Sequence, residues 1–244
     1  VTVGADTAAL VAEACAWSQA TGGHFDPTVL PALHAAGYSR SFAAGPGAIG
    51  DGAPVPGVRG IVVDVGAAVV RLPAGVGLDL GGIGKGRAAD LVADDLRGVD
   101  AGLVDLGGDL LVWGRPPGAN GWPIALEDGR SGHTVGVLGL TRGAVATSSS
   151  LRRRWARGGR SAHHLIDPRT GRPATGPLVA ATVVAGNATG ADVLAKAAVV
   201  SPSVPEAVEL LDAHGVAALL TPRVGALILV GDLAGLCWSA PEPR

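Results

Sequence analysis

The sequence predicts an α+β fold in which antiparallel sheets pack against grouped helices. Short apolar runs follow one another as hairpin-linked strands, whereas helical patterns come in groups rather than alternating with single strands. The 39 glycines and 17 prolines cluster at the turns between these runs, so they do not indicate disorder. Because 48% of the 244 residues are hydrophobic but 3% are aromatic, the core must consist of alanine, valine and leucine. We expect residues 1–244 to form a single domain.

The first third of the chain predicts two helices and a hairpin. Asp6 is suited to cap the first helix, and the glycine- and proline-containing residues 21–27 end it. Two short strand-like runs then lie close enough to pair around Gly66. The expected elements are helices over 6–20 and 30–35, a loop over 45–57, and strands over 60–65 and 67–72.

Strands dominate the remainder of the chain. Five arginines within the nine residues from Arg152 to Arg160 predict a solvated loop. Thr189 is suited to cap the helix that follows, and Ser203 with Glu206 forms a capping box for the next one. The expected helices cover 86–97, 190–200 and 203–215, and the expected strands cover 103–106, 109–113, 122–126, 134–140, 143–147, 163–166, 178–184, 216–219, 226–230 and 236–239.

Charge and hydropathy argue against two classes of protein. A formal net charge of −2 disfavours nonspecific nucleic-acid binding over the whole surface. The mean hydropathy is +0.37, yet no apolar run approaches the ~18 residues of a membrane span, so we expect no transmembrane segment. Methionine is absent even at position 1, so we expect the natural start to lie upstream of Val1. A lipoprotein signal there would place the protein at a membrane, and without one it would be cytoplasmic.

The two cysteines give little indication of a function. Cys15 lies in a helical pattern and Cys237 in a strand pattern, with no CxxC motif and no neighbouring histidine. We expect buried free thiols, with one disulfide as the alternative.

Both lysines of the chain lie in dense motifs. Lys85 is part of residues 78–86 (LDLGGIGKG), and Lys196 follows Asp192 by four residues. Because arginine carries the other basic charges, these two positions favour a point cation, which arginine's planar fork replaces poorly.

The glycine–lysine motif does not match the common phosphate-binding loops. A P-loop would have glycine at Asp79 and a hydroxyl residue after Lys85, where this chain has Gly86. The Gly82-x-Gly84-x-Gly86 spacing also differs from a dinucleotide-binding GxGxxG. What remains is either a glycine turn that enters a helix and binds an anion or an ordinary turn with a solvated lysine.

The four residues DLGG occur twice, at 79–82 and at 105–108, each time after a short apolar strand. Paired glycines let backbone amides approach a ligand without an intervening Cβ. The recurrence indicates two ligand-facing turns and is consistent with a duplicated building unit.

Asp192 and Lys196 lie on one face of a helix, with the acid first. As an exposed salt bridge this pair would contribute only ~0.3–0.5 kcal/mol. The neighbouring residues are small or apolar, so we expect the pair to line a site instead. Asp192 is also close to the helix N-terminus, where an anion is stabilised.

His163 and His164 precede a turn at Asp167 and Pro168. One interpretation makes a histidine a base or a phosphate donor at the edge of a site, and the other makes Asp167 a turn cap and a histidine a surface residue. Beside a phosphate site, the preceding arginines would attract a dianionic nucleotide or an acidic partner.

Five motifs follow one another along the chain: 21–31 (TGGHFDPTVLP), 78–86 (LDLGGIGKG), 103–109 (LVDLGGD), 146–148 (ATS) and 164–171 (HLIDPRTG). Together, and in this order, these segments resemble the ApbE family of FAD:protein FMN transferases. Asp192 matches the alanine–aspartate helix of that family, and the likeness spans nearly the whole chain. The resemblance implies an α+β fold with antiparallel sheets and a duplicated unit related to the T-fold.

The resemblance implies an enzyme that binds FAD and Mg²⁺, transfers FMN to a threonine or serine hydroxyl of an acceptor protein, and releases AMP. It implies catalytic roles for His164, Asp192 and Lys196, with His164 deprotonating the hydroxyl. It implies that Asp192 and the carbonyl of Gly82 bind Mg²⁺. The residues implied to contact FAD are Phe25, Asp26, Asp79, Gly81, Gly82, Lys85, Gly107, Gly108, Asp109, Thr147, Ser148, His164, Ile166 and Asp167.

The chain departs from the family pattern in three places. The family usually has threonine, a metal ligand, at the position of Lys196, and an ammonium cannot ligate Mg²⁺. Either Lys196 supplies part of the metal's charge or the metal shifts. Ser149 replaces a usual glycine, and the opening strand of the family has no counterpart before Val1. An FAD pyrophosphatase and a non-catalytic FAD-binding or carrier protein are the alternative functions.

Overall fold

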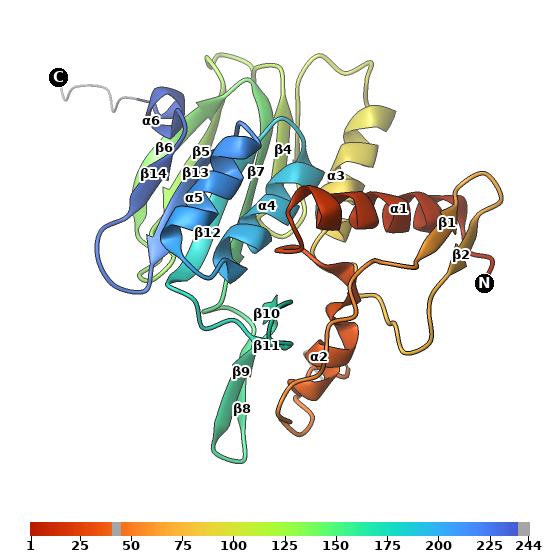
Figure 1. Cartoon of the computed structure of the whole chain (residues 1–244). Helices are drawn as coiled ribbons and strands as arrows, with labels where there is room; N and C mark the ends of the chain where they lie inside the picture. The colour runs from red at the N-terminus through yellow and green to blue at the C-terminus, as the bar shows by residue number, and fades with distance from the viewer. Residues whose placement is uncertain (41–44, 239–244) are drawn as a thin grey trace.

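A six-stranded antiparallel sheet with strand order β14-β13-β12-β7-β4-β3 forms the centre of the molecule (Figure 1). The computed structural model describes residues 1–40 and 45–238. The sheet strands are β3 (Gly102–Asp105), β4 (Leu110–Trp113), β7 (Arg142–Ser149), β12 (Leu178–Ala185), β13 (Ala217–Pro222) and β14 (Ile228–Val230). The mixture of helices with antiparallel strands confirms the predicted α+β class.

Four two-stranded hairpins and a set of helices surround this sheet. The hairpins are β1 (Val62–Asp64) with β2 (Val69–Arg71), β5 (Trp122–Glu127) with β6 (Thr134–Leu140), β8 (Arg154–Arg157) with β9 (Arg160–His163), and β10 (Ile166–Asp167) with β11 (Arg172–Pro173). The helices are α1 (Ala5–Ala20), the 3₁₀ helix η1 (Pro27–Val29), α2 (Leu30–Ala35), α3 (Gly84–Asp95), α4 (Ala188–Val200), α5 (Val204–Ala213) and α6 (Leu233–Leu236). No helix in the described part of the chain is long and apolar enough to cross a membrane.

The two faces of the sheet bury different partners. On one face α3, α4 and α5 cover the strands, and on the other the β5–β6 hairpin does so (Figure 1). Alternate residues of a strand point to opposite faces, and β7 follows this rule. Ala144 and Ala146 pack toward α3 and α4, whereas Val145 packs toward β5 and β6.

Helix α4 lies at the centre of the helical layer, where it packs on β7, β12, α3 and α5. Twelve of its thirteen residues are buried, and Lys196 is the exception. Its small side chains allow close contact with the neighbouring helix. A Cβ on Gly86 of α3 would lie 2.7 Å from both the carbonyl carbon of Ala188 and the Cα of Thr189, closer than real Cβ atoms come to backbone.

Two predicted helix caps are wrong. Helix α1 begins after Gly4 with no side-chain cap, and Asp6 lies in its first turn instead. Helix α4 is capped by Asn187, whose Oδ1 accepts from the amide of Gly190 at 2.7 Å. Thr189 is itself held from α3, because Asp90 accepts from the Thr189 amide at 2.9 Å. Ser203 does cap α5, accepting from the Glu206 amide at 3.2 Å.

Three other elements differ from the prediction. The arginine-rich residues form the β8–β9 hairpin instead of a loop, and the strand expected over 163–166 is divided between β9 and β10. The strand expected over 236–239 is replaced by the end of α6 and an isolated bridge between Cys237 and Leu138, while Ser239 lies outside the described residues. Cys15 and Cys237 are free thiols, as expected, but both are half-buried.

Candidate active site

The turn that leads into α3 and the turn between β3 and β4 meet at a lysine–carboxylate pair. Lys85 forms an ion pair with Asp109, whose side chain is 4% exposed, whereas that of Lys85 is 40% exposed. Lys85 therefore joins the two DLGG turns, a contact that the sequence did not indicate. Its ammonium is positioned by a buried carboxylate and remains accessible to a ligand.

Asp192 lies beside the same turn, at the start of α4. Asp192 is buried, with 4% of its surface exposed, and its Oδ2 accepts a hydrogen bond from the amide of Gly86 at 3.4 Å. Among the described residues, no ion pair within 4.0 Å joins Asp192 to Lys196 or to Lys85. The i, i+4 salt bridge, which was the alternative to a pair that lines a site, is therefore not formed.

Lys196 extends across Gly82. A Cβ on Gly82 would overlap the Lys196 ammonium and would lie 2.6 Å from Cε and 2.8 Å from Cδ. The lysine side chain thus fills the space that the missing side chain of Gly82 leaves open. Gly82 and Asp192, which the sequence places 110 positions apart, consequently lie at one site.

The pKa of Lys85 is lowered, mainly because burial penalises its charged form. The nearby carboxylate of Asp192 opposes this effect, whereas the positive charges of Lys196 and Arg153 add to it. These four side chains therefore lie within electrostatic reach of one another. Arg153 was not singled out from the sequence, where it is one arginine in a run.

His164 faces the same group of charges. Its pKa is lowered to about 3, mainly because of burial and also because of the positive charges of Lys196 and Arg153. Among the described residues, its buried Nδ1 has no hydrogen-bond partner. The lowered pKa leaves the imidazole neutral at pH 7. By contrast, Nε2 of His163 forms a hydrogen bond with the carbonyl of Ala174 at 2.9 Å, and this contact supports the loop.

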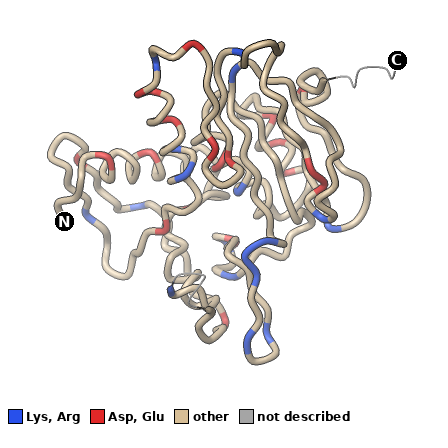
Figure 2. The backbone as a smooth tube through the Cα atoms, turned by 180° about the vertical axis from the view of Figure 1, so that it is seen from behind, with Lys and Arg blue, Asp and Glu red and all other residues tan. Residues whose placement is uncertain are grey.

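The arginines beside His164 divide between structure and site. Arg157 and Arg160 bind the loop at 46–51, donating to the carbonyls of Pro46 at 2.6 Å and Ile49 at 3.1 Å. Arg153 adopts φ 47°, a conformation that non-glycine residues rarely take, and its charge reaches the site. Figure 2 shows the basic residues gathered along this hairpin.

A cavity of about 360 Å³ opens beside Asp109, between the end of the sheet and the β5–β6 hairpin. Gly107 and Gly108 form part of its wall with φ of 71° and 91°, and a Cβ on either would meet no protein atom within 4 Å. Thr147 also lines the cavity, where its Oγ1 is 2.8 Å from that of Thr182, a residue that the sequence did not indicate. Ser148 alternates to the opposite, helical face of β7 and is buried.

Several expected FAD-contacting residues build the walls of the site. Phe25 is buried against Ile83, beneath the turn that carries Gly82. Asp26 caps η1, accepting from the Thr28 amide at 2.7 Å. Asp79 accepts from the amide of Gly81 at 3.0 Å, and its own amide donates to the carbonyl of Pro27 at 2.7 Å. The first two sequence motifs are therefore neighbours in the fold.

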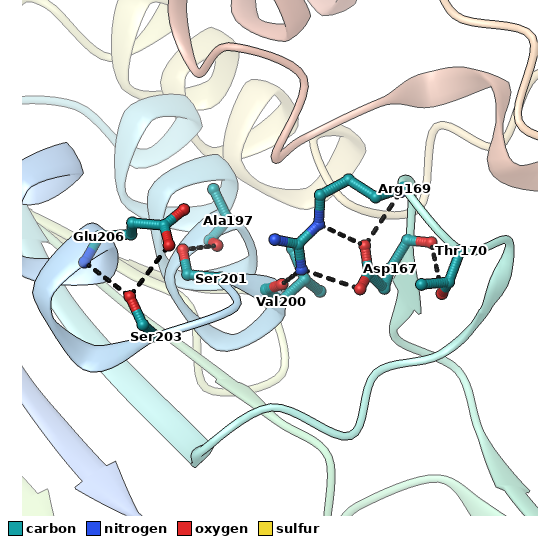
Figure 3. Close-up of polar contacts among 8 residues, drawn as sticks. All are labelled: Asp167, Arg169, Thr170, Ala197, Val200, Ser201, Ser203 and Glu206. Carbon is teal, nitrogen blue, oxygen red and sulfur yellow. Dashed lines mark hydrogen bonds and ion pairs between the residues drawn. The ribbon is translucent and has the colours of Figure 1, made fainter.

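The motif at 164–171 is fixed to the end of α4 (Figure 3). Arg169 donates to both carboxylate oxygens of Asp167, from Nε at 2.9 Å and from Nη2 at 2.8 Å. Nη2 also donates to the carbonyl of Val200 at 2.9 Å. Ile166 is buried in the cluster around Trp155. Asp167 and Ile166 thus hold the loop that presents His164.

Comparison with known proteins gives a consistent result. The model of the ApbE family matches residues 1–220. The chain is 31% identical over 209 residues to the FAD:protein FMN transferase of Treponema pallidum, covering 78% of this chain and 58% of that protein. The chain therefore spans less than two thirds of the length of this relative.

Two solved structures extend the comparison. The ApbE protein of Thermotoga maritima superimposes with a TM-score of 0.86 at 29% identity, over 98% of this chain and 80% of the other. The flavinyl transferase ApbE of Pseudomonas stutzeri gives a TM-score of 0.80 at 26% identity, over 99% and 78%. These matches confirm the expected fold and the expected family resemblance.

Proposed function

Because the chain belongs to the ApbE family, we propose that it transfers FMN from FAD to a hydroxyl group of an acceptor protein and releases AMP. The observation that carries the proposal is the convergence of Lys85, Lys196, Asp192 and His164 on the turn at Gly82. The FAD:protein FMN transferase of Treponema pallidum carries this activity in its name, and the geometry of this chain supports the same chemistry.

The charge of the site suits the diphosphate of FAD. Lys85, Lys196 and Arg153 contribute three positive charges, while Asp109 and Asp192 contribute two negative charges, so the cluster has one net positive charge with His164 neutral. The two negative charges of a diphosphate bound among the three cations would offset their mutual repulsion. Electrostatic stabilisation of this kind is the main contribution that a protein makes to phosphoryl transfer.

The reaction requires one bond to form and one to break at the FMN phosphorus. The acceptor hydroxyl oxygen attacks that phosphorus, and the bond to the bridging oxygen breaks with its electron pair remaining on AMP. His164 takes the hydroxyl proton on a ring nitrogen, and the ammonium groups of Lys85 and Lys196 neutralise the leaving phosphate. A bound diphosphate would offset the positive charges of Lys196 and Arg153, two of the causes that lower the pKa of His164.

The remaining expected residues position the nucleotide. The glycine turn at 107–108 and Thr147 offer the wall of the 360 Å³ cavity to one end of FAD. Asp109 holds Lys85 against the diphosphate. We assign the other expected residues to the support of these surfaces: Phe25, Asp26, Asp79, Gly81, Ser148, Ile166 and Asp167.

The resemblance also implies Mg²⁺ held by Asp192 and the carbonyl of Gly82. The described residues contain no group of three or more His, Cys, Asp or Glu side chains that could hold a metal ion. Instead Lys196 brings an ammonium to Gly82, and an ammonium has no lone pair to donate. The residues present therefore do not fit a divalent cation, and no step of the proposed reaction passes through one.

The proposal is tested by incubating the protein with FAD and a threonine-bearing candidate acceptor, followed by mass spectrometry of the acceptor. We expect an adduct of FMN linked through a phosphoester and an equal amount of AMP. A parallel reaction without acceptor separates the alternatives: rapid release of both FMN and AMP would indicate a pyrophosphatase. Tight FAD binding with no AMP under any metal would indicate a binding or carrier protein and would refute the transferase.

A further inference from the structure

We infer that the ammonium of Lys196 acts as a built-in cation for the diphosphate, so that this chain cleaves FAD without a divalent metal ion. The inference rests on the proposed function. Its kinetic test depends on that function, whereas its binding test depends only on the binding of FAD. It concerns Lys196, Gly82 and Asp192, three residues that meet at the turn before α3.

The geometry places the ammonium where a ligand's charge would lie. Lys196 is the one residue of α4 that is not buried, and its side chain crosses Gly82 closely enough to leave no room for a Cβ. The other twelve residues of the helix are packed into the core, so the helix cannot rotate Lys196 toward solvent. The fold therefore directs this positive charge into the site.

Lys196 also has no carboxylate partner. Among the ion pairs and hydrogen bonds of the described residues, none includes its Nζ, although Asp192 lies one turn earlier on the same helix. A partly buried charge without a partner destabilises a protein, so a lysine in this place indicates a ligand that compensates for it. An anion such as a diphosphate would do so.

The surrounding charges disfavour a divalent ion. Lys196 and Arg153 both lower the pKa of Lys85 through their positive charges, and both lower the pKa of His164 in the same way. Lys85, Arg153 and Lys196 therefore already lie within electrostatic reach of one site. A dication beside Gly82 would meet three positive charges and two carboxylates. One of those carboxylates, Asp109, is occupied by Lys85. The cluster thus already has a net positive charge for the diphosphate without a metal ion.

An ammonium performs the part of the reaction that needs charge and hydrogen bonding. It donates up to three hydrogen bonds to the diphosphate oxygens and stabilises the negative charge that develops on the leaving AMP. Lys196 takes no part in proton transfer, and His164 alone takes the proton of the attacking hydroxyl. The bonds and charges of the transfer therefore balance without any further reactant.

The kinetic test measures AMP release from FAD in the presence of the acceptor protein and compares release in excess EDTA with release in excess Mg²⁺. For the unchanged protein we expect rates within about twofold of each other. For Lys196→Thr, we expect a loss of about 10²- to 10³-fold in EDTA, the usual effect of removing one charge-stabilising donor. Added Mg²⁺ should restore much of this loss, because threonine offers a hydroxyl ligand where lysine offers none.

The binding test measures FAD affinity in EDTA from the change in flavin fluorescence. Lys196→Thr and Lys196→Met should both weaken binding by about 10- to 150-fold, the effect of losing hydrogen bonds to a charged group. The matched control is Arg97→Thr, which also removes one positive charge but from a side chain that is 77% exposed in an ion pair with Asp94. We expect unchanged affinity for this control. Circular dichroism melting of all variants verifies that each is folded.

The outcomes separate the inference from the proposed function. If the unchanged protein loses AMP release in EDTA and regains it with Mg²⁺, the inference is refuted and the transferase stands. If no metal supports AMP release, the transferase is refuted, and EDTA-insensitive FAD binding that depends on Lys196 still supports the built-in cation. If Lys196→Met binds FAD in EDTA as tightly as Arg97→Thr does, the ammonium has no role and the inference is refuted.

Discussion

Three glycines in one turn are expected to have three different roles, which single alanine substitutions can separate. In Gly82-Ile83-Gly84-Lys85-Gly86, the first glycine faces Lys196, the second faces open space, and the third faces the backbone of α4. None of the three has a positive φ, so alanine is conformationally acceptable at each position. Differences among the variants will therefore report on what each Cβ meets.

Gly86→Ala should destabilise the fold. Its Cβ would lie 2.7 Å from two backbone atoms of Ala188 and Thr189, and backbone cannot move aside as a side chain can. Overpacking of this kind costs about 1–3 kcal/mol, which for a chain of this size lowers the melting temperature by about 2–12 °C. Gly84→Ala is the matched control, because its Cβ meets nothing within 4 Å. It should raise stability by about 0.4–1 kcal/mol through the lower entropy of the unfolded chain.

Gly82→Ala should affect function instead of stability. Its Cβ would overlap the end of the Lys196 side chain, which is flexible and can swing away at a cost below about 1 kcal/mol. The displaced ammonium would no longer face the diphosphate, and a misplacement of about 1 Å costs on the order of 100-fold in rate. Thermal melting and AMP release from FAD are the two measurements. Full activity in Gly82→Ala, or a raised melting temperature in Gly86→Ala, would show that the respective contact is not as described.

Three further predictions concern the charged groups. Asp192→Asn should lower FMN transfer while the melting temperature changes by less than about 4 °C, because Asp192 accepts from the Gly86 amide and its charge acts on Lys85; undiminished transfer, measured by mass spectrometry, would show that the site does not need this carboxylate. Because the unfolded chain protonates His164 near pH 6.5 and the folded chain near pH 3, stability should fall as the pH falls through this window, by up to about 1.4 kcal/mol per pH unit. Urea melts from pH 4 to 7 measure this slope, and His164→Asn should flatten it; an unchanged slope would contradict the buried neutral imidazole. Asp90→Ala should cost about 0.5–2 kcal/mol, since Asp90 accepts from the amides of Ala188 and Thr189; a melting temperature equal to that of the unchanged protein would deny this interhelical cap.

The patterns that a single segment carries were enough to predict most of the fold. Strand β6 follows its predicted bounds of 134–140, and α2 follows 30–35, because alternation and flanking glycine or proline act locally. The prediction failed where a distant residue decides the outcome. Thr189 has a good capping side chain, but Asp90 on α3 already binds its amide and hydroxyl. No feature near residue 189 reveals that contact.

The prediction for the arginine-rich segment was wrong for a related reason. Its high charge predicted a solvated loop, yet Arg160 donates to Asp51 at 2.8 Å and to the carbonyl of Ile49, and Trp155 is buried with its indole donating to the carbonyl of Ala36 at 2.8 Å. These partners lie more than a hundred positions earlier in the chain. A tryptophan among the arginines was the one local signal that this segment packs against something.

The sequence named many residues of the candidate site, but it did not separate those that face a ligand from those that support the fold. Motif spacing placed Lys85 and Asp109 on two similar turns, but it did not indicate that their side chains form an ion pair. Spacing does not distinguish a carboxylate that contacts a ligand from one held by a neighbour, as Asp167 is held by Arg169. It also does not single out Arg153, whose backbone conformation alone sets it apart within the run.

The burial of α4 explains why the identity of residue 196 decides the chemistry of the site. Twelve buried residues fix the rotation of the helix, so any side chain at this position must point at Gly82. A hydroxyl there can only complete the ligand set of a cation that comes from solution, whereas an ammonium brings the charge with it. The absence of a side chain at Gly82 leaves the space that the lysine fills. Residues 82 and 196 should therefore be energetically coupled: Gly82→Ala should lower FAD affinity in the lysine protein but have little effect in Lys196→Thr, and equal losses in both backgrounds would rule out the contact on which the built-in cation depends.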